Sequence, residues 1–288
     1  MRQAMPHEGP AIESWLSQFP ATTMFLRSNL AHMGLGQSEH ANSTDFWIAE
    51  KAAGEIVGVL GVTKAGWVMA QFAQETPLDI DAIRAVLTRY PLCGFNGDMQ
   101  IMQPLIEGLG IDRNAFQILD DDVLYTLDLK DLRLPDLEGA EVRQAQEHDF
   151  DQLVRWREAF EIEALSTPKE MARGRAERSA RRLLDQGWSY VLQASGRGVA
   201  QDVAMAGFNA KIADLVQIGG VYTPPTLRGK GYGGAVVGQM LDMARRDGVG
   251  QAILFAATAE AGRVYERLGF KAIGHYTLSV LKDAKGQG

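Results

Sequence analysis

Cysteine is nearly absent from the sequence, because Cys93 is the only one among 288 residues. A lone cysteine excludes an intrachain disulfide and fits a reducing compartment. It lies in the short apolar run 92–95, where a free thiol is more often a small buried apolar group than a nucleophile. We therefore expect Cys93 in the core, with a nucleophilic thiol as the less favoured alternative.

The sequence also lacks long apolar runs and an excess of basic residues. No apolar run approaches the roughly 18 residues of a membrane-spanning helix, and residues 1–4 lack the charged-then-apolar pattern of a signal peptide. The formal net charge of -7 argues against a dedicated nucleic-acid binder. The histidines show no metal-ligand spacing. We expect a cytoplasmic protein without a metal, a nucleic-acid partner or a membrane partner, and the oligomeric state stays open.

The composition that remains is that of a globular protein, with 46% hydrophobic and 23% charged residues. A chain of 288 residues is long enough for two ordinary domains. The segment 134–139 contains Pro135 and Gly139, which interrupt regular structure, so it is the best candidate for a linker. We predict two domains, residues 1–134 and residues 135–288.

Hydrophobic periodicity predicts an α/β (α+β) mixture in both parts. After the linker, we expect strands at 141–145, 188–194, 203–212, 215–223, 252–256 and 270–281, and helices at 147–164, 169–185, 232–246 and 259–268. Before it, we expect helices within 12–32, 79–90 and 98–109, and strands at 46–50, 55–62, 67–72, 93–95 and 123–129. The two orders are similar, which favours a tandem duplication over a coincidence of pattern.

A glycine-rich turn carries the clearest chemical signal. It follows the strand 215–223 and Pro224-Pro225, leads into the helix at 232, and reads Arg228-Gly229-Lys230-Gly231-Tyr232-Gly233-Gly234. Glycines let successive backbone N–H groups point the same way, and the helix start adds unpaired donors and a positive dipole end. Because Arg228 and Lys230 add positive charge, a diphosphate is the expected ligand.

Other glycine-rich motifs fit the turn less well. Gly229-x-Gly231-x-x-Gly234 matches a dinucleotide fingerprint, but residues 224–228 separate it from the strand and no acidic residue ends the strand at 252–256. A kinase glycine loop needs a long catalytic lobe after it. A turn whose glycines serve only packing is the remaining alternative.

Two motifs resemble those of the GNAT superfamily of N-acetyltransferases. Arg228-x-x-Gly231-x-Gly233 matches the (Gln/Arg)-x-x-Gly-x-(Gly/Ala) signature, and the segment 265–270 resembles the Tyr-x-x-Leu-Gly-Phe block of that family. The resemblance covers about residues 141–281. It implies tandem GNAT-like domains, each with a mixed, mostly antiparallel twisted sheet flanked by helices, of which the first is degenerate.

The resemblance also implies acetyl-CoA as co-substrate and assigns roles to residues. The backbone of the strand end around Tyr222, through the amides of Val221 and Thr223, would hold the pantetheine arm. Tyr265 would lie near the thioester sulfur and protonate it as general acid, with packing in the core as the alternative. The pyrophosphate would lie on Arg228, Gly229, Lys230, Gly231, Tyr232, Gly233 and Gly234.

The sequence departs from the family pattern at two positions. Thr258 stands where the family often has Asn; it suits a helix N-cap, so only a secondary cofactor contact is in doubt. Gln217 stands where many members carry a glutamate as general base. Glu163, or Glu161 near it, is our candidate for that base, against the alternatives of solvated surface carboxylates and a chain of water molecules.

Two charged segments complete the sequence-based picture. In the first part, the connection 73–77 has no glycine and carries Glu75, so it would repel a diphosphate; we expect the first domain to serve structure or substrate recognition. The basic stretch 173–182 would receive an acidic acceptor or the 3′-phosphate of CoA, although a solvated helix face is the default interpretation.

The expected function is transfer of an acetyl or short acyl group from coenzyme A to a primary amine. The acceptor, a small molecule or peptide, is not identified by the sequence. A non-catalytic acyl-CoA-binding or sensor module is the main alternative, and a dinucleotide-dependent oxidoreductase is the third.

Overall fold

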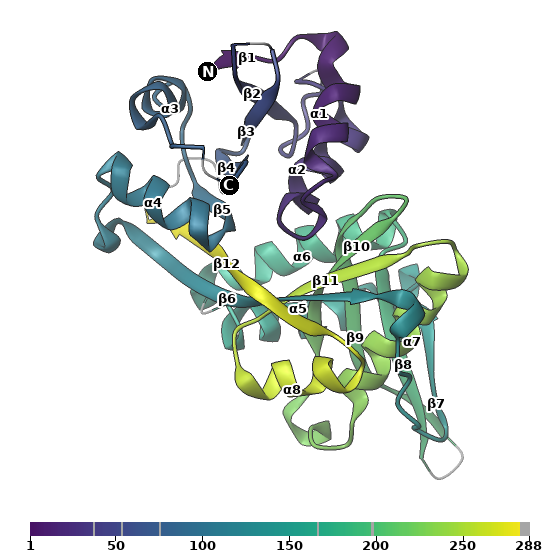
Figure 1. Ribbon diagram of the computed structural model, residues 1–288. Helices are drawn as coiled ribbons and strands as arrows, with labels where there is room; N and C mark the ends of the chain where they lie inside the picture. The colour runs from purple at the N-terminus through teal and green to yellow at the C-terminus, as the bar shows by residue number, and fades with distance from the viewer. Residues whose placement is uncertain (37, 53, 75, 166, 197–198, 283–288) are drawn as a thin grey trace. The chain divides into compact units, whose positions relative to one another are not determined.

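The computed structural model describes residues 1–36, 38–52, 54–74, 76–165, 167–196 and 199–282. The chain forms two compact units, one made of Met1–Leu124 with Ala272–Gly288 and the other of Tyr125–Lys271. Figure 1 shows the course of the chain through its elements. The division therefore falls inside a strand rather than in the expected linker, and the last strand of the chain belongs to the first unit.

The first half of the chain follows a β-α-α-β-β-β-α-β-α-β order. Its elements are β1 Arg2–Gln3, α1 Gly9–Leu16, α2 Pro20–Met33, β2 Thr44–Glu50, β3 Ile56–Thr63, β4 Trp67–Phe72, α3 Ile80–Leu87, β5 Gly94–Asp98, α4 Met99–Leu109 and β6 Phe116–Asp128, with the 3-10 turns η1 Pro6–Glu8, η2 Arg113–Ala115 and η3 Leu129–Asp131 near its ends. Strands β1 to β5 lie in chain order, antiparallel except for the parallel pair β4–β5.

The second half of the chain repeats this order. Its elements are β7 Ala140–Gln144, η4 Glu147–Asp149, α5 Phe150–Glu163, α6 Lys169–Asp185, β8 Ser189–Gly196, β9 Val199–Lys211, β10 Leu215–Tyr222, η5 Pro225–Leu227, α7 Tyr232–Arg246, β11 Gln251–Ala256, α8 Ala259–Arg267 and β12 Lys271–Leu281. Strands β7 to β11 again lie in chain order, with β10–β11 as the parallel pair. The predicted fold class and the repeated order are confirmed.

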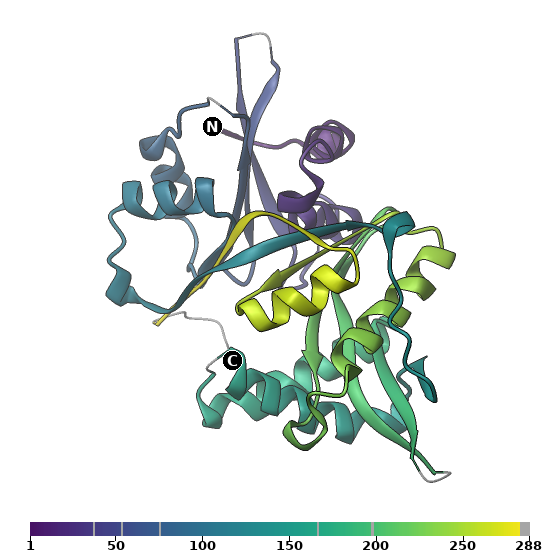
Figure 2. The ribbon, with the colours of Figure 1, turned by 60° about the horizontal axis from the view of Figure 1, so that its bottom comes forward.

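The last strands of the two halves of the chain exchange places in the order of the sheet. Strand β12 pairs antiparallel with β5, from Tyr276↔Asp98 to Val280↔Gly94, and has β6 on its other side. Figure 2 shows β12, in yellow, running along β6, in teal. In the second unit, the neighbour of β11 is the end of β6. The sequence gives no sign of this exchange, because strand partners far apart in the chain leave no local pattern.

Most element boundaries agree with the sequence-based predictions. Helices α6 and α7 and strand β4 have the expected ends. Strand β6 begins at Phe116 rather than near 123, because Asp120–Asp122 lie inside it and hide the strand pattern. Cys93 is 1% exposed and burial raises its pKa to about 12, which confirms the core assignment and argues against a thiolate nucleophile.

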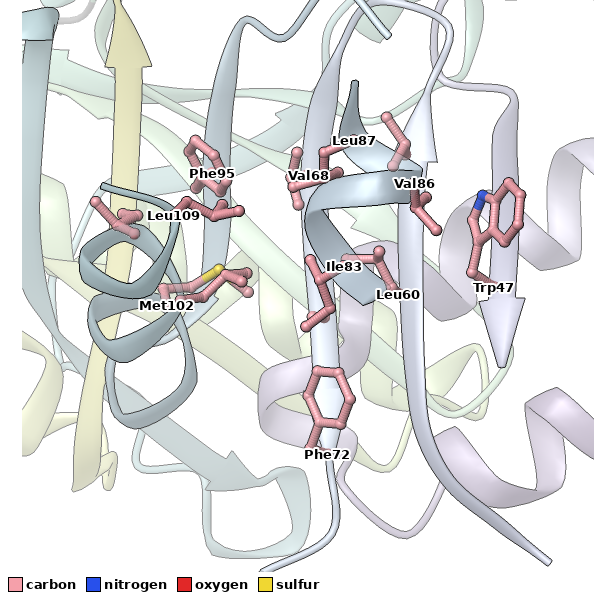
Figure 3. Close-up of a cluster of buried hydrophobic side chains, with 14 of the residues drawn as sticks. Trp47, Leu60, Val68, Phe72, Ile83, Val86, Leu87, Phe95, Met102 and Leu109 are labelled. Atoms are coloured by element: carbon pink, nitrogen blue, oxygen red, sulfur yellow. The ribbon is translucent and has the colours of Figure 1, made fainter. Parts of the chain in front are cut away.

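Each unit has its own apolar core. In the first, Ile83 of α3 and Met102 of α4 pack on the sheet residues Val68, Phe72 and Phe95, as Figure 3 shows. In the second, α5 and α6 cover one face of the sheet, and the residues in contact are Leu153, Val154, Trp156, Ala176, Ala180, Val191, Met205 and Tyr222. The alanines of α6 let this helix approach the sheet closely. Because side chains alternate along strands, α7 is left with the opposite face, where it contacts β7 to β10.

Candidate functional site

Strand β10 is distorted near its end by two glycines. Its register with β9 shifts between Gln217 and Ile218 and again between Gly219 and Tyr222. A Cβ on Gly219 would lie 1.9 Å from Nδ2 of Asn209, and Gly220 has a φ of 61°. Bulges of this kind accept glycine because other residues clash or are strained there. Within the described residues, the recorded pairs with β11 end at Gln217↔Ile253, so the distorted part lies beyond the paired part.

The turn between β10 and α7 presents an open helix N-terminus. Gly229 and Gly231 have φ values of 79° and 80°, and beyond their chain neighbours no heavy atom of the described residues lies within 4 Å of their ideal Cβ positions. Their backbone conformation, rather than crowding, therefore requires glycine. Gly231 is the N-cap of α7, and no side chain of the described residues caps this helix. Its first N–H groups are thus available to an anion, and the helix dipole favours negative charge there.

A cavity of about 340 Å³ lies at this helix end. Its size is within the range of small-molecule sites. The predicted residues that line it are Thr223, Arg228, Gly229, Gly231, Tyr232, Gly233 and Gly234. Sequence reasoning missed the other lining residues, Pro135, Leu227, Val264, Arg267 and Leu268. Val264 precedes the 265–270 motif, and Arg267 and Leu268 lie inside it. The position of this motif could therefore have predicted that its residues line the cavity.

The end of β10 has two faces with different partners. Thr223 faces the cavity, and its Oγ1 lies 3.7 Å from the Cβ position of Gly233. Tyr222 is 7% exposed, packs in the cluster with α5 and α6, and does not line the cavity. Val221 is half-buried between them and, like Lys230, is not among the lining residues. The strand end therefore has the cavity on one side and the α5–α6 face on the other.

Glu163 lies at the end of α5 and interacts with the turn. Its Oε2 accepts from Nη2 of Arg228 at 2.5 Å, and its Oε1 accepts from the hydroxyl of Tyr222 at 3.1 Å. The hydrogen bond from Arg228 is the main reason why the pKa of Glu163 lies below its ordinary value. The carboxylate is ionised at neutral pH, but a lowered pKa makes it a weak base. Glu161, the other candidate, accepts from the hydroxyl of Thr167.

Tyr265 is a buried side chain on α8. It is 9% exposed, and its ring meets that of Phe270 edge-on at 6.0 Å between centroids. Burial raises its pKa to about 12, so the hydroxyl stays protonated at neutral pH. Its neighbour Val264 lines the cavity, although Tyr265 itself does not. The position suits both a proton donor beside the cavity and a packed core tyrosine.

Two further predicted positions have local structural tasks. Thr258 is exposed and caps α8, with its Oγ1 accepting from the N–H of Ala261 at 3.2 Å; it does not line the cavity. Gln217 is 2% exposed and its Nε2 donates to the carbonyl of Ile218 at 2.7 Å, beside the bulge. The strand thus offers an amide where a base would be needed.

The basic helix α6 is mostly an ion-paired surface. Arg173 pairs with Glu177 and Glu158, and Arg181 pairs with Glu147, as a solvated helix face predicts. Arg182 departs from this pattern, because it is half-buried and donates to the carbonyl of Asn209 at 3.4 Å.

Neither a metal site nor a membrane helix is seen in the described part of the chain. No group of three or more His, Cys, Asp or Glu side chains there is arranged to hold a metal ion. No helix within the same residues is both long and apolar enough to cross a bilayer.

Comparison with known proteins identifies related sequences and folds. Residues 141–273 match the family model described as acetyltransferase (GNAT) domain. A Drosophila protein solved by the Northeast Structural Genomics Consortium is 12% identical with a TM-score of 0.65, and the match covers 97% of this chain and 98% of that one. A GCN5-related N-acetyltransferase from Kribbella flavida is 14% identical with a TM-score of 0.56, and covers 97% of both chains.

A third structure has the same two-part architecture. It is described as a tandem GNAT protein from the clavulanic acid biosynthesis pathway, is 12% identical with a TM-score of 0.53, and covers 99% of this chain and 98% of that one. At these identities the likeness is one of fold and carries no activity with it. The curated proteins contain no match to the sequence.

Proposed function

This chain belongs, through its residues 141–273, to the GNAT acetyltransferase superfamily, and from that premise we propose that it transfers an acetyl or other short acyl group from coenzyme A to a primary amine. The GNAT domain implies acyl-CoA as co-substrate. The observation that carries the proposal is the uncapped N-terminus of α7, with Gly229 and Gly231 in left-handed conformations, opening on the cavity. A cytoplasmic location rests on the cysteine count and stays a prediction.

The residues at this helix end fit the charged part of CoA. Backbone N–H groups at a helix start bind phosphate oxygens well, and no Cβ stands in front of them at Gly231, Gly233 and Gly234. Arg228 and Lys230 supply positive charge. We propose that these residues, with Gly229 and Tyr232, hold the pyrophosphate, and that Thr258 contributes at most an outer contact.

The distorted end of β10 fits the pantetheine arm. Its main chain beyond Gln217 has no register partner in β11 among the described residues, and the carbonyl of Thr223 accepts from Nε of Arg228 at 3.0 Å. We propose that the N–H groups of Val221 and Thr223 pair with the carbonyls of the arm. Such pairing would bring the thioester to the bulge. Preorganised N–H groups there would polarise its carbonyl oxygen.

The bound acyl-CoA supplies an activated acyl carbon and a thiol leaving group. The amine nitrogen forms a bond to the acyl carbon, the carbon–sulfur bond breaks, nitrogen loses one proton and sulfur gains one. An amine with a pKa of about 10.4 must first lose its extra proton to a base or to solvent. Holding both reactants in place itself supplies a large part of the acceleration.

Two side chains are our candidates for the proton transfers. Tyr265 keeps its proton because its pKa is about 12, so it is a suitable donor to the departing sulfur. Glu163 is ionised and lies at the same turn, but its hydrogen bond with Arg228 weakens it as a base. We therefore propose Tyr265 as general acid, and assign the base to Glu163 only in the state in which Arg228 has turned to the diphosphate.

Binding and turnover measurements test the proposal. We expect the protein to bind CoA in a calorimetric titration. In a screen of an amine library, we expect it to release free thiol from acetyl-CoA when an amine that it accepts as substrate is present. Binding of NAD without binding of CoA would select the oxidoreductase. Binding of CoA with no amine-dependent thiol release would select the sensor, which the amide of Gln217 in place of a carboxylate base favours.

A further inference from the structure

A buried arginine without a carboxylate partner lies under the bulge of β10. Arg157 of α5 is 5% exposed. Its Nη1 donates to the hydroxyl of Ser179 on α6 at 2.8 Å, and its Nε has no hydrogen-bond partner among the residues that the structure describes. Burying a guanidinium against neutral groups alone costs free energy, so its retention calls for a function.

The guanidinium lies against the part of β10 where the proposed reaction takes place. A Cβ on Gly220 would be 2.9 Å from Nη2 of Arg157, and one on Gly207 of β9 would be 3.6 Å from the same atom. Only hydrogen atoms stand at these positions, which lets the guanidinium approach the strand surface. Arg157 comes from the α5–α6 face, opposite the cavity at α7, and reaches the residue that precedes Val221.

A second cation strengthens the positive charge at this place. Burial lowers the pKa of Arg157, and the charge of Arg182 on α6 lowers it further; burial also lowers the pKa of Arg182 itself. Its recorded acceptors are neutral, the side chain of Gln186 and the carbonyl of Asn209. Glu161 is the carboxylate that acts on the charge of Arg157, and its Oε2 accepts from the hydroxyl of Thr167. Among the described residues, the hydrogen bonds of Arg157 and Arg182 go to neutral groups.

We propose that Arg157, assisted by Arg182, binds the carboxylate of the acceptor, so that the acceptor is an amino acid with a free α-carboxylate. A guanidinium fork matches a carboxylate with two parallel hydrogen bonds. In an α-amino acid the amine is on the carbon next to the carboxylate. A carboxylate held beneath Gly220 therefore leaves the amine beside the bulge, where the thioester carbonyl is proposed to lie. The inference rests on the proposed acyl transfer and names its substrate class.

Substrate pairs give the first test. Acetyl-CoA and the wild-type protein are combined with a panel of amino acids, and each amino acid is compared with its amide and with the decarboxylated amine. We expect kcat/KM for the acid to exceed that for its partners by about ten- to a hundredfold, as for a hydrogen-bonded charged group. Equal rates for the acid, the amide and the amine would overturn the inference and leave the acyltransferase intact.

Variants of the arginine give the second test. Arg157→Met should lower kcat/KM for the amino acid through a higher KM, leave the rate with the decarboxylated amine unchanged, and leave CoA affinity unchanged. Because it removes a buried charge, it should unfold at the same or a higher temperature than the wild type. A structural arginine would behave in the opposite way, with a lower unfolding temperature and equal losses for both substrates.

Controls keep the two proposals separable. Arg155→Met alters an exposed arginine of the same helix and should change neither KM nor stability. Ser179→Ala removes only the hydrogen bond that orients Arg157 and should raise the amino-acid KM by a few fold, which provides a second variant if the first does not fold. If no acceptor turns over, binding of the amino acids to the CoA-saturated protein is measured by calorimetry. Binding that requires the carboxylate and is lost in Arg157→Met supports the inference. A protein that shows no such carboxylate-dependent binding overturns it. Failure to bind CoA at all instead refutes the proposed function.

Discussion

The two units have the same order of elements but begin their corresponding helices differently. In the first unit, the carboxylate of Asp79 caps α3 and accepts from the N–H of Ala82 at 3.0 Å. In the second, Gly231 occupies the N-cap of α7 and no described side chain caps it. A carboxylate already fills the anion-binding position of α3, whereas α7 leaves it open. The repeated fold therefore has an open helix start in the second unit, where we propose the phosphate site, and a capped one in the first.

The strands that lead to these helices differ in the same sense. The β3–β4 register runs from Gly58↔Phe72 to Val62↔Val68 without a shift, whereas the β9–β10 register shifts twice. The connection 73–77 includes Glu75, which lies outside the described residues, so its predicted repulsion of a diphosphate stays a prediction. We infer that the first unit serves structure or substrate recognition and does not hold CoA.

The difference between the two helix starts is tested most directly by placing at the N-cap of α7 the aspartate that caps α3. Gly231→Asp should reduce CoA affinity by a hundredfold or more, because a carboxylate would face the diphosphate, while aspartate tolerates a left-handed backbone better than most residues. Calorimetric titration with CoA measures the effect. Gly248→Asp is the matched control, since Gly248 follows the other end of α7 with a φ of 95° and no neighbour near its Cβ position. Equal affinity for both variants would refute the pyrophosphate assignment.

The next largest effect is expected at Tyr265. Tyr265→Phe should lower kcat about a hundredfold, as removal of a general acid does, and leave CoA affinity unchanged. Because burial raises the pKa of Tyr265 to about 12, the protonated form persists through the working range. The wild-type rate should therefore rise with pH as the amine loses its proton, and should not fall from ionisation of Tyr265 until the pH approaches 12. A decline with a midpoint near 10 would show instead that the tyrosine is not the buried donor described here.

A smaller effect is expected at Glu163. Whether its substitution changes CoA affinity or kcat distinguishes a carboxylate that restrains Arg228 from one that acts as the base. If the carboxylate mainly restrains Arg228, Glu163→Gln frees the guanidinium and tightens CoA binding by a few fold with little change in kcat. If it is the base, kcat falls by about a hundredfold and the dependence of the rate on pH changes. Glu158→Gln, which alters an ion pair of the same helix away from the cavity, is the control.

Local sequence pattern predicted those parts of the molecule that local physics determines. The ends of α6 and α7 follow from periodicity, and the open start of α7 at Gly231 follows from a glycine-rich turn before a helix. The exchange of β6 and β12 was beyond such reasoning, because pairing across the chain depends on tertiary context. Arg157 was missed for a similar reason. The sequence alone suggests that an arginine on an amphipathic helix is exposed to solvent, and only the structure shows that Gly207 of β9 and Gly220 of β10 leave room for its guanidinium.

The smallest effect is expected from removing the cap in the first unit. Asp79→Ala deletes one hydrogen bond at the start of α3 and should lower the free energy of unfolding by about 1 kcal/mol, measured by urea titration. It should not create a second CoA site, because the connection before α3 still lacks glycines that could turn its N–H groups toward a phosphate. The calorimetric stoichiometry should therefore remain one CoA per chain in the wild type and in the variant. If Asp79→Ala bound a second equivalent of CoA, the cap alone would explain why the first unit does not bind CoA. The bulge and the glycines of the second unit would then not be required for binding.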